Sequence, residues 1–101
     1  MQESGQAQRR IIQVIFALAG NELMGLAPSE IQRALGVNSA STVTRDLAVL
    51  KDMGIAEQVQ ETGRWRLGPR VVQIARDFEL NLAKAKTKVA ELEQRYTRST
   101  N

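Results

Sequence analysis

Apolar residues recur at helical spacing in the first part of the chain, starting just after Arg9. The stripe stops at Gly20 and Asn21, two residues that commonly terminate helices. Its members are Ile11, Ile12, Val14, Ile15, Leu18 and Ala19. Residues 1–8 before it are polar, contain Gly5 and lack an apolar period, so we expect a flexible arm there. The pattern therefore predicts a first core helix that begins at Arg9.

Two more helical segments follow, separated by Gly36. Pro28 suits the first position of a short helix, and Glu30 is favourable near its positive end. Gly36 ends that helix, because glycine readily adopts the left-handed conformation of a sharp turn. Asn38, Ser39 and Ser41 can cap the next helix, which should end by Gly54. Its inward positions, spaced i, i+4, i+7, are Val43, Leu47 and Leu50. A short helix, a tight turn and a longer helix predict a helix-turn-helix.

After this helix the apolar period changes from that of a helix to that of a strand. Residues 55–67 contain two short runs around a turn at 61–63, which predicts a β-hairpin. Alternation places Trp65 and Leu67 on one face and the two arginines beside them on the other. A hairpin after a helix-turn-helix predicts a winged helix-turn-helix domain over residues 9–68.

The last segment, residues 69–96, has the features of a long helix that begins at Pro69. Residues 97–101 after it are polar, and we expect them to fray. The apolar residues of the helix are spaced alternately by four and three, which is the heptad pattern of a coiled coil. They are Val71, Ala75, Phe78, Leu82, Ala85, Val89, Leu92 and Tyr96.

This heptad seam has two interpretations. The part up to Phe78 directly follows the wing and can pack on the first helix of the same chain. Beyond Leu82 we favour a homodimer, because so small a domain lacks the surface to cover so long a helix. The expected dimer contacts, with the helix orientation left open, are Phe78, Leu82, Ala85, Val89 and Leu92. The predicted fold is mostly α with a small β-hairpin, a winged helix-turn-helix followed by a long C-terminal helix.

The amino-acid composition limits the kinds of catalytic and metal site that the protein can contain. The 101 residues have room for one compact domain. The sequence contains neither Cys nor His, which excludes thiolate nucleophiles, imidazole bases and the common zinc sites. We therefore expect no enzyme activity, no cofactor and no metal.

No apolar leader or membrane-length run is present, so we expect a cytoplasmic protein without a membrane partner. The net charge is only +3, but ten of the fourteen cations are Arg, which suits phosphate and guanine recognition.

Short polar side chains at the start of the third helix are candidate DNA contacts. Such side chains let the backbone approach phosphates and base edges. They are Ser39, Ser41, Thr42 and Thr44. Arg45 beside them is long enough to reach the two acceptors of guanine. The alternative is that these hydroxyls are only helix caps and solvated surface.

Four more arginines are candidate DNA contacts. Arg64 and Arg66 flank the hairpin turn and can lie along the phosphate backbone or reach a minor groove. The alternative for them is a charged strand that faces solvent. Arg9 and Arg10, at the start of the first helix, complete the set.

The run GRWRLGPR, from Gly63 to Arg70, resembles the wing end of the isocitrate-lyase-regulator (IclR) family of bacterial transcription factors. The run STVTR, from Ser41 to Arg45, resembles the start of that family's recognition helix. The similarity covers about residues 9–75 and implies a winged DNA-binding fold. By this resemblance, DNA contact falls to Ser41, Thr42, Thr44, Arg45, Arg64 and Arg66.

The sequence departs from the family pattern in two places. The turn before Val43 and the wing before Gly63 are each one residue longer than in the family, so base contacts can slide to Asn38 or Ser39. Family members also continue into a large C-terminal effector domain, which this similarity does not include. We therefore expect no small-molecule effector.

These observations predict a sequence-specific regulator of transcription that binds double-stranded DNA as a homodimer. Repression is favoured, because no further surface is evident for recruiting polymerase. The alternative is an assembly factor whose winged helix and long C-terminal helix dock a partner protein. A docking surface would be apolar, and only Ala48 and Val49 point that way.

Overall fold

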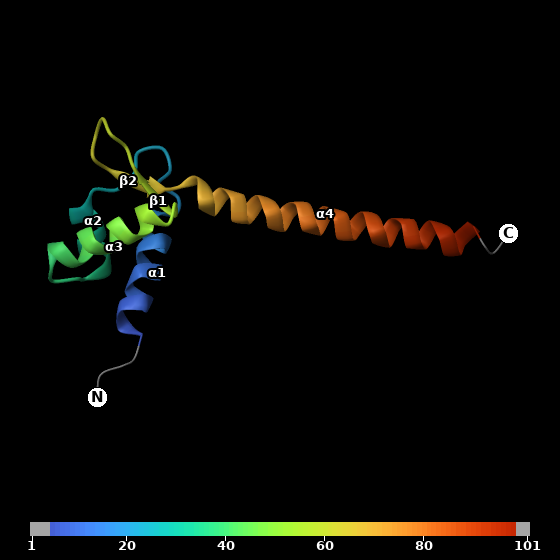
Figure 1. The fold of residues 1–101 in the computed structure, drawn as a ribbon, viewed down its shortest axis with the longest axis horizontal. Coiled ribbons are helices and arrows are strands. Elements are labelled where there is room, and N and C mark those ends of the chain that lie inside the picture. Colours follow the sequence, from blue (N-terminus) through green and yellow to red (C-terminus); the bar gives the residue numbers. More distant parts are fainter. Residues whose placement is uncertain (1–4, 99–101) are drawn as a thin grey trace. The chain divides into compact units, whose positions relative to one another are not determined.

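The computed structural model describes residues 5–98. They form, in order, α1 (Gln6–Leu18), α2 (Pro28–Leu35), α3 (Ala40–Asp52), β1 (Ala56–Gln58), β2 (Trp65–Leu67) and α4 (Pro69–Arg98) (Figure 1). The chain divides into one unit that ends at Val71 and a second that begins at Val72. The predicted fold class is confirmed: a mostly α chain with a two-stranded hairpin and a long C-terminal helix.

Two helix ends differ from the sequence prediction. α1 begins at Gln6, directly after Gly5, so residues 6–8 belong to this helix and not to a flexible arm. Gly5 has φ 78, a left-handed conformation that glycine adopts without a steric penalty. At the other end α4 runs to Arg98, so Thr97 is helical and not part of a frayed tail. The rest of the predicted arm and tail lies outside the described residues.

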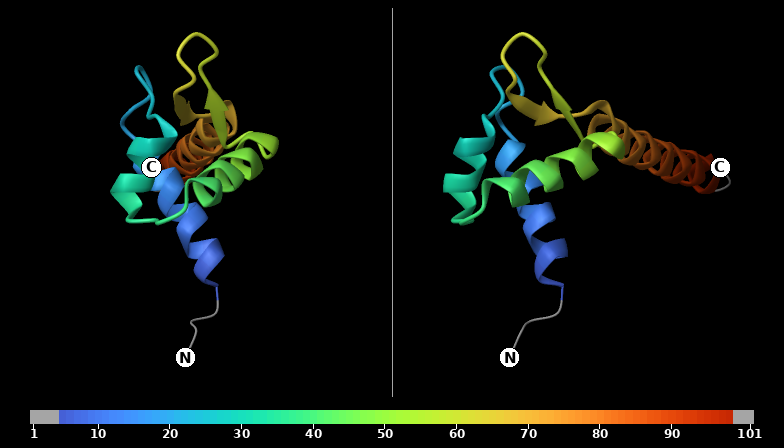
Figure 2. Two further views of the ribbon diagram at one scale, coloured as in Figure 1. Left: turned by 90° about the vertical axis from the view of Figure 1, so that its left-hand side faces the viewer. Right: turned by 60° about the vertical axis from the view of Figure 1, so that its left-hand side comes forward.

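The core of the first unit lies where α1, α2, α3 and the hairpin meet (Figure 2). Each of these elements contributes apolar side chains at the spacing that the sequence predicts. The buried members are Val14, Leu18, Ile31, Val43, Leu47, Leu50, Ala56 and Trp65. Leu67, from the same face of β2 as Trp65, packs against them. This core holds the outer face of α3 in a fixed place relative to the hairpin.

The hairpin is antiparallel, and Glu57 pairs with Arg66 across it. A third segment joins it: Leu26 forms a bridge with Trp65, in which each backbone nitrogen donates to the other residue's carbonyl oxygen, at N···O distances of 2.7 and 2.8 Å. Gly25 makes this close approach possible, since a Cβ there would lie 2.8 Å from the Trp65 carbonyl oxygen. The loop before α2 therefore anchors the wing to the helix-turn-helix.

α4 carries its apolar residues on the surface. No residue of this helix is buried. Large exposed side chains include Phe78, Leu82, Val89 and Leu92 of the predicted seam. Among the described residues, no helix is long and apolar enough to cross a membrane.

Candidate nucleic-acid interface

The start of α3 exposes a group of short hydroxyl side chains. Ser39 is the N-cap residue by its backbone conformation, with φ −117 and ψ 121, but its side chain makes no capping hydrogen bond. Its Oγ instead lies 2.8 Å from the Oγ of Ser41. Thr42 is half-buried, and Thr44 is exposed and donates to the carbonyl oxygen of Ala40 at 3.1 Å. The capping alternative therefore does not account for Ser39 and Ser41.

Arg45 lies one position beyond these hydroxyls and is exposed. Its guanidinium forms no ion pair or hydrogen bond with any other residue in the described part of the chain. A planar, permanently charged guanidinium can donate two parallel hydrogen bonds to the O6 and N7 atoms of guanine. The structure thus brings Ser39, Ser41, Thr42, Thr44 and Arg45 together at one end of one helix.

Arg10 has a different environment. Its Nε and Nη2 atoms donate to the two carboxylate oxygens of Asp46, at 2.6 and 3.0 Å. Asp46 is 6% exposed and lies on the buried face of α3 with Val43, Leu47 and Leu50. The hydrogen bond with Asp46 raises the pKa of Arg10 above its ordinary value. This bidentate pair joins α1 to α3, and it engages two nitrogens of a guanidinium that the sequence analysis names as a candidate DNA contact.

The pair with Asp46 was not predicted from the sequence. The signal for it is the spacing of Asp46, which falls on the same helical face as Val43 and Leu50. A carboxylate on an inward face needs a charged or hydrogen-bonding partner, because burial of an unpaired charge is costly.

Arg64 anchors the wing. Its Nη2 lies 2.7 Å from Oε1 of Glu30 and 3.1 Å from the carbonyl oxygen of Gly25, and its Nε donates to Met24 O at 3.1 Å. The same Glu30 oxygen accepts the backbone N–H of Ala27 at 2.8 Å, at the start of α2. The Ala27 hydrogen bond, aided by the Arg64 charge, lowers the pKa of Glu30.

The other wing arginine is also paired. Arg66 Nε lies 2.7 Å from Oε2 of Glu57, its neighbour across the hairpin. Its side chain remains 37% exposed, so its other guanidinium nitrogens can still reach a phosphate. Arg9 is exposed on α1 and has no side-chain partner among residues 5–98. DNA contact by Arg9, Arg10, Arg64 and Arg66 stays a prediction, and three of them also form ion pairs within the protein.

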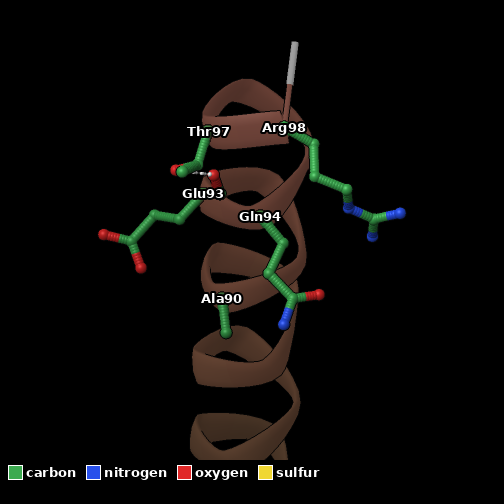
Figure 3. Close-up of a pocket in the computed structure, with 5 residues that line it drawn as sticks. All are labelled: Ala90, Glu93, Gln94, Thr97 and Arg98. Atoms are coloured by element: carbon green, nitrogen blue, oxygen red, sulfur yellow. Dashed lines mark hydrogen bonds between the residues drawn. The ribbon is translucent and has the colours of Figure 1, made fainter. Parts of the chain in front are cut away.

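A metal-ligand cluster is absent from residues 5–98, and a hollow on α4 lies outside α3 and the wing. In the described part of the chain, no three His, Cys, Asp or Glu side chains gather as metal ligands. The hollow on α4 is lined by Ala90, Glu93, Gln94, Thr97 and Arg98 (Figure 3). All five side chains belong to one helix, so this hollow is an open groove between neighbouring turns.

Comparison with known proteins gives a structural match. No family model matches the sequence, and no curated protein matches it. The chain is similar to the crystal structure of the repressor BlcR from Agobacterium tumefaciens, with a TM-score of 0.56 and 28% sequence identity. The match covers 71% of this chain and 28% of the BlcR chain, so this chain spans less than a third of that protein. This match confirms the resemblance found in the sequence, to a winged helix-turn-helix domain of the IclR type.

Proposed function

We propose that this protein is a sequence-specific regulator of transcription that binds double-stranded DNA through the start of α3. The observation that carries the proposal is Arg45, an exposed guanidinium without a partner among the described residues, close in sequence to two serines whose hydroxyls bond only to each other. The short serine side chains allow α3 to approach DNA closely, and the long side chain of Arg45 can then reach a base. Similarity to a repressor supports a regulator that binds DNA.

The paired arginines support this role by fixing the geometry of the interface. The bond between Arg10 and Asp46 holds α3 against α1, and Arg64 holds the wing against the loop before α2. A binding surface whose supporting residues are already locked loses less entropy on association. We assign positioning to Arg10 and Arg64, and phosphate contact to Arg9 and Arg66.

We further propose that the protein acts as a homodimer and as a repressor. The exposed heptad seam of α4 supports dimerisation, because its large side chains have no cover within their own unit. Repression is proposed from the similarity to BlcR, which is a repressor.

The docking-module alternative has some support in α3. Val49 is 48% exposed and Met53 is 64% exposed, near the end of this helix. Val49 lies one helical turn beyond Arg45, so this apolar surface borders the arginine, but the similarity to a repressor does not favour a docking role. We therefore retain DNA binding as the proposed function.

Selection of duplexes from a random pool, followed by titration at two salt concentrations, tests this function. We expect an enriched sequence and an affinity that falls steeply with salt, because phosphate contacts release counterions. Arg45→Ala should relax the base preference at one position. The free energy that favours the preferred base there should fall by about 1 to 3 kcal/mol. Arg33→Ala, which removes an exposed cation from α2, is the matched control and should leave the preference intact. No enrichment and no salt dependence would support the docking alternative instead.

A further inference from the structure

The outward face of α3 is a ridge of four residues that lies opposite its buried face. The buried residues are Val43, Asp46, Leu47 and Leu50. At 3.6 residues per turn, the direction about 180° from their centre is occupied by four exposed residues. They are Ser41, Arg45, Ala48 and Asp52, and we call this set the reading ridge. Any groove that α3 enters will meet the reading ridge first.

The chemistry of the reading ridge changes along the helix. Ser41 and Arg45 offer hydrogen-bond donors, Ala48 offers only a methyl group, and Asp52 offers a negative charge. Asp52 has no ion pair with any described residue, and it stands at the negative end of the helix dipole, where an acid is unfavourable. Helix stability therefore does not explain this acid. Phosphates would repel it, so the end of α3 should stay away from the DNA backbone.

From this gradient we infer that α3 enters the major groove only from its start to Ala48, so that Arg45 reads a guanine and Ala48 contacts the methyl group of a neighbouring thymine. The inference rests on the proposed DNA-binding function. Among the bases, thymine alone presents a methyl group in the major groove, and alanine is one of the side chains that pack against it. Arg45 and Ala48 are about 4.5 Å apart along the helix axis, close to the spacing of about 3.4 Å between base pairs. A half-site should therefore contain a guanine with a thymine next to it.

Replacing that thymine by uracil tests the contact without altering the protein. Uracil lacks only the methyl group, so wild type should bind the uracil duplex about fourfold more weakly per half-site. Ala48→Gly removes the methyl partner and should bind the two duplexes equally. Circular dichroism checks that this variant keeps its helices, because glycine in a helix costs about 1 kcal/mol.

Asp52→Asn tests whether the contact between α3 and the major groove ends before Asp52. Loss of the negative charge should strengthen binding to every sequence and leave the selected sequence unchanged. A new preference at one position would show that Asp52 reads a base, and the inferred limit at Ala48 would be wrong.

The outcomes separate this inference from the function on which it rests. Absence of any enriched duplex contradicts the proposed function itself. An enriched duplex that wild type binds equally with thymine or uracil leaves DNA binding in place and overturns the Ala48 contact. A thymine preference that survives in Ala48→Gly overturns it as well.

Discussion

Arginine side chains in the winged unit differ in whether a carboxylate lies within reach. Arg10 has Asp46, Arg64 has Glu30 and Arg66 has Glu57, each at 2.6 to 2.7 Å. Arg45 has no such partner among the described residues. A paired guanidinium has part of its donor set satisfied within the protein, whereas Arg45 keeps all five N–H donors for a ligand. This difference is the reason for separating positioning from base recognition.

Removal of Asp46 should show how much the buried pair contributes to stability. Asp46→Ala leaves Arg10 without its partner beside the core, and we expect the free energy of unfolding to fall by about 2 to 3 kcal/mol. The Arg10 side chain is 25% exposed, which keeps this value below that of a fully buried pair. Denaturant unfolding measures the change.

The double variant Arg10→Met with Asp46→Leu is the matched control. Apolar residues of similar size often replace a buried ion pair at little cost, so this variant should lose much less stability than Asp46→Ala. Equal losses in the two variants would mean that packing at Asp46, and not the unpaired charge, sets the stability.

For single residues, the sequence allowed the candidate DNA contacts to be found. It did not distinguish the arginines that pair within the protein from those that remain available to DNA. Arg45 was predicted from its type and its place in a helix-turn-helix. The pairing of Arg10 with Asp46 joins residues 36 positions apart and depends on how α1 packs on α3. Local spacing does not carry that information. The one local clue was a carboxylate on an otherwise apolar helical face.

Among the elements, the wing is fixed by the loop before α2. Backbone bonds between Leu26 and Trp65, together with the Arg64 side chain, join the hairpin to that loop. Glu30 couples this anchor to α2, because one oxygen accepts from both Ala27 and Arg64. Loss of the Glu30 charge should therefore loosen the wing.

The pH dependence of stability should reveal this coupling. The pKa of Glu30 is lower in the fold than its ordinary value of 4.5. Its contribution to stability is thus present above about pH 4.5 and is lost as the pH falls through the lowered pKa. Glu30→Gln keeps an amide oxygen but not the charge, so its stability deficit should shrink below pH 4.5. Urea unfolding between pH 6 and pH 3 measures the difference from wild type.

Glu61→Gln provides the control, since the Glu61 carboxylate has no partner within residues 5–98. Its stability should follow wild type at every pH. A deficit of Glu30→Gln that stays constant down to pH 3 would mean that the charge of Glu30 does not hold the wing.

The helices of the fold were largely predictable, because each carries apolar residues at helical spacing, buried in α1, α2 and α3 and exposed in α4, and Gly, Pro or polar residues lie near the helix ends. The extra turn of α1 was not, since residues 6–8 bury no apolar side chain and left no periodic signal. The bridge between Leu26 and Trp65 was also missed. It consists of backbone hydrogen bonds between segments distant in sequence, and these bonds do not depend on side-chain type.

The whole molecule combines a winged unit with a helix whose apolar seam is exposed. One winged module supplies modest affinity, and a second module linked to it acts at a high effective concentration. A two-fold dimer would read an inverted repeat. Dimerisation through α4 would therefore determine affinity without a new contact to DNA.

Charges placed in the seam of α4 should separate dimerisation from DNA binding by a single winged unit. Leu82→Glu combined with Leu92→Glu would bury unpaired charges in a dimer, which costs several kcal/mol, so we expect a monomer by sedimentation. The winged core is untouched, and binding to a single half-site should match that of one wild-type module. Binding to a full palindrome should weaken by a factor of about 10² to 10⁴.

Leu80→Glu is the matched control. Leu80 is as exposed as Leu82 and Leu92, at 52% against 46% and 49%, but it lies off the seam. A wild-type protein that is already monomeric at micromolar concentration would contradict the dimer and mean that the seam packs within its own chain.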